Sequence, residues 1–533
     1  MAATLWWMAS GEEALGAPRD LAESAAGGDA ARRLREATDA LESVVRDRSL
    51  MRGLSAAERT RLIAAAGDVF NPDVVARRAW SKALRRQEKA AQLRRDETTL
   101  AETGLRVLRD RPVFTTPNVF PPSDFEQTEV AGDSGFREVS EPRHCYVCKQ
   151  HFVAVHHFYD QLCVSCGDFN YAKRGESADL GGRVALLTGG RVKIGYQAGI
   201  KLLRAGARLV VTTRFPRDCV ARYANEADFD DWADRLEIFG LDLRHTPSVE
   251  AFCEHLSATR ERLDFIVNNA CQTVRRPAAF YRHMLEAERV SARTMPAQLR
   301  ALLGDYEELR GAGILRAGLK AEAGRGTGSI AGVTHAAELS QVSLLEEDVG
   351  ADRGLFPAGR LDSDRQQVDL RGRNSWRLLL SEVSSVELLE TQLVNAVAPF
   401  LLNARLKPLM LRTAERDKHI VNVSAVEGQF YRRFKTTRHP HTNMAKAALN
   451  LMTRTSAADY QADGIHMNSV DTGWVTDEDP VEIAERKTAE HRFRPPLDIV
   501  DGAARIVDPI ISGFATGEHV WGRFLKDFRP TDW

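Results

Sequence analysis

The chain has 533 residues, of which 43% are hydrophobic and 28% are charged, and its formal net charge is −1. This length exceeds one ordinary hydrophobic core and predicts two or three domains. The near-neutral charge excludes a general attraction to nucleic acid or membrane surfaces, and no apolar run approaches the ~20 residues that span a bilayer. Residues 1–10 lack the basic leader of a signal peptide, so we expect no membrane association.

The first part of the chain is predicted to be helical. Residues 1–30 are rich in Ala, Gly and Ser and are expected to be mobile, whereas 31–111 show helical patterns, with capping-box spacing in SAAE at 55–58. The run at 77–95 is strongly basic and could contact phosphates. The interpretation we favour is a solvated helix face or a face for an acidic protein, with nucleic acid unlikely as a partner. Residues 112–142 contain Pro, Thr and Asp without periodicity and indicate a linker or extended arm.

Two CxxC pairs follow this arm, CYVC at 145–148 and CVSC at 163–166. Such pairs can place four thiolates in a tetrahedron, which is the preferred geometry of a structural zinc site. The predicted ligands are Cys145, Cys148, Cys163 and Cys166. A closed four-cysteine site leaves no position for a substrate, so residues 143–175 are predicted to form a small module that zinc folds.

Three histidines lie between the cysteine pairs: His151, His156 and His157. One of them could replace a cysteine as ligand, although surface or packing roles are expected. Seven cysteines, four of them in CxxC pairs, indicate metal binding in a reducing compartment rather than disulfides. We therefore expect a cytoplasmic protein.

From residue 183 onward, short apolar runs alternate with helical periods. Six runs are predicted to be strands: 183–188, 208–213, 236–240, 264–269, 419–424 and 465–470. This alternation predicts an α/β fold with a doubly wound parallel sheet of the Rossmann type. A long insertion at about 272–385, with its own helices and the glycine-rich link AGRGTGSIAG, could be a lid over the cleft or a docking surface.

The stretch LLTGGRVKIGYQAGIKLL at 186–203 reads as a strand, a glycine-containing turn and a helix. This arrangement directs backbone N–H groups and the helix N-terminus toward a pyrophosphate. A carboxylate after the second strand would favour NAD, but Thr213 and Arg214 stand there. Together with Arg191, Arg214 could pair with a 2′-phosphate, so NADP(H) is the predicted cofactor.

Taken in order, these motifs resemble the short-chain dehydrogenase/reductase family over about 180–533, apart from the insertion. The TGxxxGxG turn of the family appears as TGGRVKIG, although Lys193 replaces its middle glycine; its NNAG appears as NNAC, and Thr472 replaces the proline of its PG turn. The residues that this resemblance and the residue patterns together predict to contact the dinucleotide are Thr188, Gly189, Arg191, Lys193, Ile194, Gly195, Arg214, Asp242, Leu243, Asn269, Ala270, Lys446, Gly473, Val475 and Thr476.

The resemblance also implies catalytic positions, and one of them is changed. Asn395, Ser424 and Lys446 match the relay asparagine, the substrate-holding serine and the ribose-binding lysine of the family, but Thr442 stands where its proton-donating tyrosine belongs. A threonine hydroxyl is far less acidic than a phenol and cannot easily donate that proton.

Other residues between Ser424 and Lys446 could supply the proton. Tyr431 lies in a second YxxxK spacing, YRRFK, and His441 adjoins the threonine and titrates near neutrality. His439 and Glu427 are weaker candidates.

Two functions remain open from the sequence. The first is an NADP(H)-dependent oxidoreductase that acts on a carbonyl, a hydroxyl or a conjugated double bond with an altered proton relay. The second is a non-catalytic or weakly catalytic NADP(H)-binding sensor or scaffold with a zinc-stabilised partner interface. A homo-oligomer is compatible with the resemblance, and the N-terminal helical region or the insertion could bind a protein partner. The substrate is not indicated.

Overall fold

The computed structural model describes residues 19–71, 73–117, 137–307, 309, 336–349, 353–431 and 435–533, without side chains for 19–28, 76, 347, 353 and 491. The chain divides into two compact units, Met1–Leu93 and Arg94–Trp533. Residues 1–18 of the segment expected to be mobile, 118–136 of the predicted arm and the glycine-rich link of the insertion lie outside the described residues.

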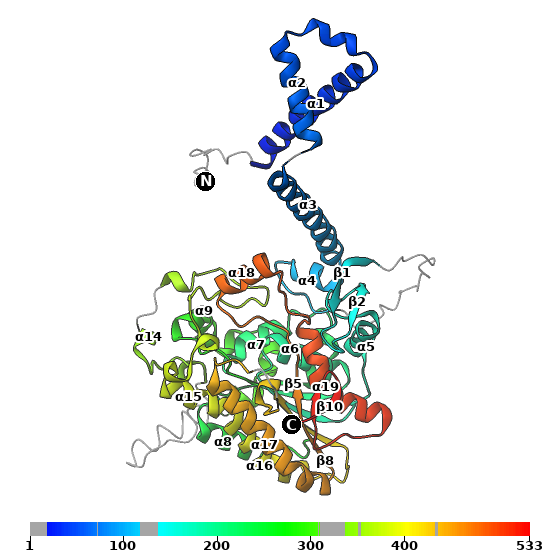
Figure 1. The fold of residues 1–533 in the computed structure, drawn as a ribbon. Helices are drawn as coiled ribbons and strands as arrows, with labels where there is room; N and C mark the ends of the chain where they lie inside the picture. The colour runs from blue at the N-terminus through cyan, green and yellow to red at the C-terminus, as the bar shows by residue number, and fades with distance from the viewer. Residues whose placement is uncertain are drawn as a thin grey trace, which may run out of the picture. The chain divides into compact units, whose positions relative to one another are not determined.

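The first unit is helical (Figure 1). It contains α1 (Arg19–Arg46), a 3-10 turn (Arg48–Gly53), α2 (Ala56–Phe70) and the start of α3 (Val74–Ala101). The predicted capping box is confirmed, because the Ser55 side chain accepts from the Glu58 backbone while Glu58 accepts from the Ser55 backbone. None of the side chains described between residues 29 and 93 is buried, so this unit has no described hydrophobic core of its own.

The second unit begins with a small module around the cysteines. Helix α4 (Gly104–Arg109) precedes the antiparallel hairpin of β1 (Glu138–His144) and β2 (His151–Ala154), and α5 (Val164–Gly175) follows. One cysteine pair occupies the hairpin turn, and the other occupies the N-cap and first turn of α5. We call residues 143–175 the four-cysteine module.

The main sheet has eight strands in the order β10-β9-β8-β7-β6-β3-β4-β5. All neighbours are parallel except β10 and β9. The strands are β3 (Val184–Thr188), β4 (Arg208–Thr213), β5 (Leu236–Gly240), β6 (Phe265–Asn268), β7 (Lys418–Ser424), β8 (Ile465–Asp471), β9 (Phe524–Lys526) and β10 (Arg529–Thr531). The predicted doubly wound α/β fold is confirmed, and all six predicted strands are present. The strand order reverses between β3 and β6, and ligands of open α/β sheets bind beyond the strand ends at such a point.

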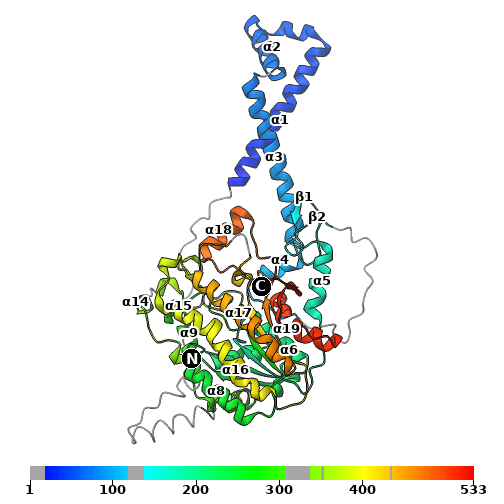
Figure 2. The same cartoon turned by 60° about the horizontal axis from the view of Figure 1, so that its bottom comes forward.

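Helices cover both faces of the sheet, whose strands β3, β7 and β8 are buried along their whole length. One face carries α6 (Lys193–Arg204), α7 (Pro216–Tyr223) and α19 (Ile499–Thr516), and the other carries α8 (Thr246–Thr259), α16 (Ala398–Met410) and α17 (Pro440–Ala462). Figure 2 shows α16 and α17 side by side in front of the sheet, where Lys407 of α16 pairs with Asp459 of α17 at 2.7 Å.

The insertion adds short helices beside the strand ends. They are α9 (Ala278–Arg289), α10 (Ala297–Ala301), α13 (Ala336–Leu339) and α14 (Glu346–Val349). Helix α15 (Ser385–Gln392) begins where the insertion ends, and α18 (Val481–His491) follows β8. Phe280 and Tyr281 of α9 pack with Phe215, which follows β4, in a separate apolar cluster. The start of the insertion therefore packs next to the end of β4, where Thr213 and Arg214 are predicted to decide between NAD and NADP(H).

Candidate functional site

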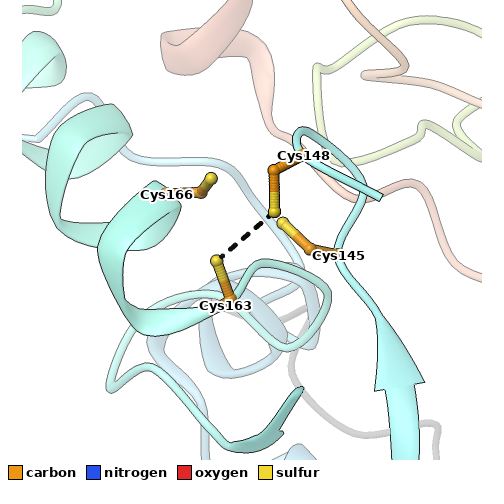
Figure 3. Close-up of side chains that lie close together, drawn as sticks. All are labelled: Cys145, Cys148, Cys163 and Cys166. Carbon is orange, nitrogen blue, oxygen red and sulfur yellow. Dashed lines mark hydrogen bonds between the residues drawn. The ribbon is translucent and has the colours of Figure 1, made fainter. Parts of the chain in front are cut away.

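The four predicted metal ligands lie together. All four sulfur atoms are within 4.8 Å of one another, and Figure 3 shows the hairpin pair facing the pair from α5. Zinc–sulfur bonds of about 2.3 Å in a tetrahedron require sulfur–sulfur distances of about 3.8 Å. The distance between the Sγ atoms of Cys148 and Cys163 is 3.8 Å, so the donor set fits a zinc-sized ion.

The protonation of two of these cysteines would depend on a bound cation. Burial raises the pKa of the Cys163 and Cys166 thiols, so without a positive charge both would stay protonated at neutral pH. A divalent ion reverses this preference, because metal binding stabilises the thiolate. The histidines between the pairs lie outside this cluster, although His156 is buried and accepts at its Nδ1 from the Phe158 backbone N–H at 3.0 Å.

The glycine turn joins β3 to α6 and is closely packed. Gly189 has a φ of 68°, and a side chain at Gly195 would overlap the Asn269 amide and the Gly189 carbonyl. Asn269 Nδ2 donates to the carbonyl oxygens of Thr188 and Gly189 at 3.0 and 3.1 Å, and the Ala270 N–H donates to Thr188 Oγ1 at 3.0 Å. These contacts hold the turn close to the end of β6.

Lys193, the departure from the family turn, also has a positive φ, 54°. Its positive charge acts on two carboxyl groups, Glu478 and Asp364. Burial favours the neutral form of Glu478, but Lys193 holds the pKa of that carboxyl below its ordinary value. Burial raises the pKa of Asp364 despite Lys193. The lysine therefore offsets negative charge from the insertion and from the segment after β8.

Two arginines lie near the end of β4, where the adenine end of a dinucleotide is predicted to bind, and they differ in their partners. Arg191 is buried and pairs with Asp218 at 2.6 Å. Arg214 donates to the Tyr281 hydroxyl at 2.8 Å, and no described carboxylate forms an ion pair with it. Burial raises the pKa of Tyr281, but Arg214, together with Arg276 and Arg191, lowers it below its ordinary value. Of the two predicted phosphate-binding arginines, Arg214 is therefore the one that forms no ion pair with a described carboxylate.

Asp242, the predicted acidic residue near the adenine, is already paired. It is buried, and Arg244 Nη2 donates to Asp242 Oδ2 at 2.7 Å. Burial favours the neutral acid, but Arg244 holds the pKa of Asp242 below its ordinary value. Its carboxylate thus anchors the turn after β5.

A single cavity of about 890 Å³ unites these groups, at the upper end of the size range of small-molecule sites. Of the predicted cofactor residues, all except Thr188 line it, including Leu243, Val475 and Thr476. The cavity reaches from Arg214 past the glycine turn to Ser424 and Lys446.

At the reacting end, Ser424 ends β7 and Lys446 lies on α17. Lys446 Nζ donates to the Val423 carbonyl oxygen at 2.8 Å, and the buried Ser424 Oγ has no hydrogen-bond partner among the described residues. Gly428 lets its loop approach α17, because a side chain there would overlap the Lys446 backbone. A buried serine hydroxyl without a partner suits a polar atom of a bound ligand.

The other predicted catalytic residues do not line the cavity. The Thr442 hydroxyl is buried without a hydrogen-bond partner among the described residues, and Tyr431 is 54% exposed with its hydroxyl 3.4 Å from Thr531 Oγ1. His441 is buried with Nε2 3.5 Å from a Glu387 carboxylate oxygen. Asn395 lies in a π-turn (Leu393–Val397) and exchanges two hydrogen bonds with the Gln272 backbone, at 2.7 and 3.1 Å.

Two weaker candidates from the sequence, His439 and Glu427, do line the cavity. The His439 ring stacks on Trp376 with 3.8 Å between ring centroids. Burial, and then the neighbouring His441, lower the pKa of His439 to about 4, so its imidazole is neutral at neutral pH.

The cavity is also lined by residues outside the predicted site residues, among them Tyr146, Tyr281 and Trp376. Each comes from outside the strand ends, the first from the four-cysteine module and the others from the insertion. For the insertion, no local sequence pattern showed which side chains face the cavity. Tyr146 gives no signal apart from its place between two cysteines.

Comparisons with known proteins agree with this arrangement. Residues 183–295 match the family model described as short chain dehydrogenase, and residues 377–497 match the model described as Enoyl-(Acyl carrier protein) reductase. An uncharacterized protein of Acanthamoeba polyphaga mimivirus is 30% identical over 384 residues, which cover 69% of this chain and 71% of the viral protein.

Solved structures with a similar fold include the RhlG/NADP active-site complex of Pseudomonas aeruginosa, at 17% identity and a TM-score of 0.38 over 65% of this chain and 95% of that one. Another is a putative short-chain dehydrogenase/reductase from Burkholderia multivorans with bound NADP, at 16% identity and a TM-score of 0.38 over 66% and 99%.

No helix among the described residues is long and apolar enough to cross a membrane. The two family models match the sheet domain on either side of the insertion and include its two ends, and the viral relative extends the match over most of the chain. The chain belongs to the short-chain dehydrogenase family.

Proposed function

We propose that this protein is an NADP(H)-dependent oxidoreductase that transfers hydride to or from a carbonyl, a hydroxyl or a conjugated double bond. The observation that carries the proposal is the cavity that joins Arg214, the glycine turn, Ser424 and Lys446. Its volume, about 890 Å³, is sufficient for an extended dinucleotide with room left at the serine end.

The choice of NADP(H) over NAD(H) rests on the end of β4. No carboxylate stands directly at the end of this strand to bind a ribose hydroxyl, and Arg214 donates to the Tyr281 hydroxyl. A guanidinium that is not already paired with an acid can form charge-assisted hydrogen bonds to a phosphate without first breaking an ion pair. Arg214 and Tyr281 would hold the 2′-phosphate, and Arg191, paired with Asp218, would add positive potential.

At the other end, the residues present suit the orientation of a ligand. Bound NADP(H) would supply or accept the hydride. Ser424, whose hydroxyl has no partner among the described residues, would hold the substrate oxygen, and Lys446 would bind the nicotinamide ribose next to the Val423 carbonyl. The paired Asn395 and Gln272 would fix the π-turn that borders this end.

We place the proton step at His439 rather than at Tyr431 or His441, because His439 is the one of the three that lines the cavity. Its neutral ring can accept a proton from a hydroxyl substrate and can carry one only transiently in the reverse direction. The relay therefore differs from that of the family, and turnover is expected to be slower than with a tyrosine at 442.

The second candidate function, a non-catalytic NADP(H) sensor or scaffold, is favoured by one observation. Thr442 buries a hydroxyl that has no partner among the described residues, at the position one helical turn before Lys446. In this function the nucleotide would be a structural or sensing ligand, and the four-cysteine module and the insertion would bind a partner.

Turnover separates the two functions. The purified chain is incubated with NADPH and a panel of aldehydes, ketones and conjugated enones, and the nicotinamide absorbance is followed. Lys446→Met serves as the inactive control, and Tyr431→Phe as the variant that should keep the wild-type rate. Consumption of NADPH that Lys446→Met abolishes supports the enzyme, and saturable binding without consumption across the panel supports the sensor.

A further inference from the structure

The four-cysteine module contributes a wall to the cavity. Tyr146, between the first two cysteines, and Lys149, just after the second, line the same cavity as Gly195 and Lys446. The Tyr146 hydroxyl accepts a hydrogen bond from the Trp474 N–H at 3.0 Å, in the turn that follows β8. A side chain of the module therefore reaches the segment that closes the cavity.

Tyr146 is held in this place by charged groups of its surroundings. Lys149 Nζ lies 4.7 Å from the centroid of the Tyr146 ring and donates to the Tyr146 carbonyl oxygen. Lys526, at the end of β9, lies 5.2 Å from the same centroid. Ammonium groups within about 6 Å of an aromatic ring are attracted to its face. These contacts fix the orientation of the ring relative to the cavity.

The module also holds the far end of the segment after β8. Gln161 Nε2 donates to the Arg494 carbonyl oxygen at 2.7 Å, and the Gln161 carbonyl in turn accepts from the Tyr146 N–H at 2.8 Å. Leu162 packs in one apolar cluster with Val475 and Leu497, and Ile194 of the glycine turn packs against this cluster. Both ends of the segment 474–497 are thus held by contacts with residues of the four-cysteine module.

The segment between these anchors forms part of the cavity lining, through Thr476, Asp477, Glu478, Asp479 and Lys487. A segment whose two ends are already held by contacts loses less conformational freedom when a ligand binds. The position of these anchors is linked to the cysteines, because the hairpin turn and the start of α5 bring their four sulfur atoms within 4.8 Å of one another, where a metal would hold the two parts together.

We propose that Tyr146 is a positioning residue of the nucleotide site and that a zinc-type metal on the four cysteines sets nucleotide affinity through it. This inference rests on the proposed NADP(H) binding. Metal holds the turn that contains Tyr146 and Lys149, Tyr146 holds Trp474, and the segment 474–497 then closes over the nucleotide. Loss of the metal leaves the sheet domain folded but frees the Tyr146 turn and the segment 474–497 from their positions beside the nucleotide.

The experiment uses the full chain and two readouts, bound zinc by mass spectrometry and NADPH affinity by nicotinamide fluorescence. Chelation should weaken NADPH binding by about tenfold or more, and added Zn²⁺ should restore it, since metal binding is coupled to local folding. Far-UV circular dichroism checks that the sheet domain stays folded. Unchanged NADPH affinity in the metal-free, folded chain would overturn the inference.

Variants separate Tyr146 from general loss of the module. Tyr146→Ala should retain bound zinc and weaken NADPH binding by about tenfold, whereas Tyr146→Phe, which keeps the ring, should lose less. Val153→Ala, an exposed position of β2 in the same module that does not line the cavity, should match the wild type. Wild-type affinity in Tyr146→Ala with zinc bound would refute the role of Tyr146, even if chelation unfolds the chain. Absence of NADPH binding to the zinc-loaded wild type would instead refute the proposed function.

Discussion

Removal of the Arg214 guanidinium is expected to change cofactor preference without closing the site. In Arg214→Ala, the 2′-phosphate of NADPH loses its charge-assisted partner, while the Tyr281 hydroxyl and the paired Arg191 remain. A hydrogen bond to a charged group contributes about 1.5–3 kcal/mol, which corresponds to a loss of about 10- to 150-fold in NADPH affinity. NADH has no 2′-phosphate, so its affinity should change by no more than about twofold on the same reasoning.

The assay is a fluorescence titration of each nucleotide at one fixed ionic strength, because salt screens charge–phosphate contacts. Arg282→Ala is the matched control, since Arg282 adjoins Tyr281 on α9 and is exposed. Equal losses for NADPH and NADH in Arg214→Ala would show that the residue supports the fold of the site rather than the phosphate. Unchanged NADPH affinity would remove Arg214 from the site altogether.

Three further outcomes follow from the packing of the sheet domain. Gly195→Ala should abolish nucleotide binding and destabilise the fold by about 1–3 kcal/mol, because its Cβ overlaps the Asn269 amide; a wild-type denaturation midpoint would contradict this. Arg174→Met should cost about 3–5 kcal/mol in unfolding experiments, because it leaves the Asp498 and Asp501 carboxylates buried and unpaired; a loss below 1 kcal/mol, on the order of an exposed ion pair, would argue against it. Burial lowers the pKa of three clustered histidines, His419, His466 and His519. Their unfolded forms bind protons more readily, so stability should be full above pH ~6.5 and fall as pH is lowered below it. Urea titrations between pH 8 and 5 should show a smaller decrease for His519→Gln than for the wild type, and parallel decreases would exclude the cluster as a cause.

Much of the fold could be predicted from the sequence because its signals are local. The strands β3, β4 and β6 are continuous apolar runs that end at a glycine turn, at Thr213 and at the NNAC motif, and such runs are typical of buried parallel strands. The short strands β9 and β10 were missed because three residues carry no periodic signal. The cysteine pairs indicated a common site because CxxC spacing fixes two ligands at a time.

The candidate site was less predictable, because its walls come from distant parts of the chain. Tyr431 lies between two family positions in sequence, yet its hydroxyl lies next to Thr531 near the C-terminus and outside the cavity. Tyr146 is almost 280 residues from Ser424 in sequence, yet both line the cavity. Such contacts depend on how a loop packs on another element, and no spacing within the loop encodes them.

The most direct test of the central claim, that the cavity is an NADP(H) site, is isothermal titration calorimetry of the zinc-loaded chain with NADPH and with NADH. One NADPH should bind per chain, and the affinity for NADH should be at least about tenfold lower, because NADH has no 2′-phosphate to contact Arg214. A folded, zinc-loaded protein that binds neither nucleotide, or that prefers NADH, would contradict it.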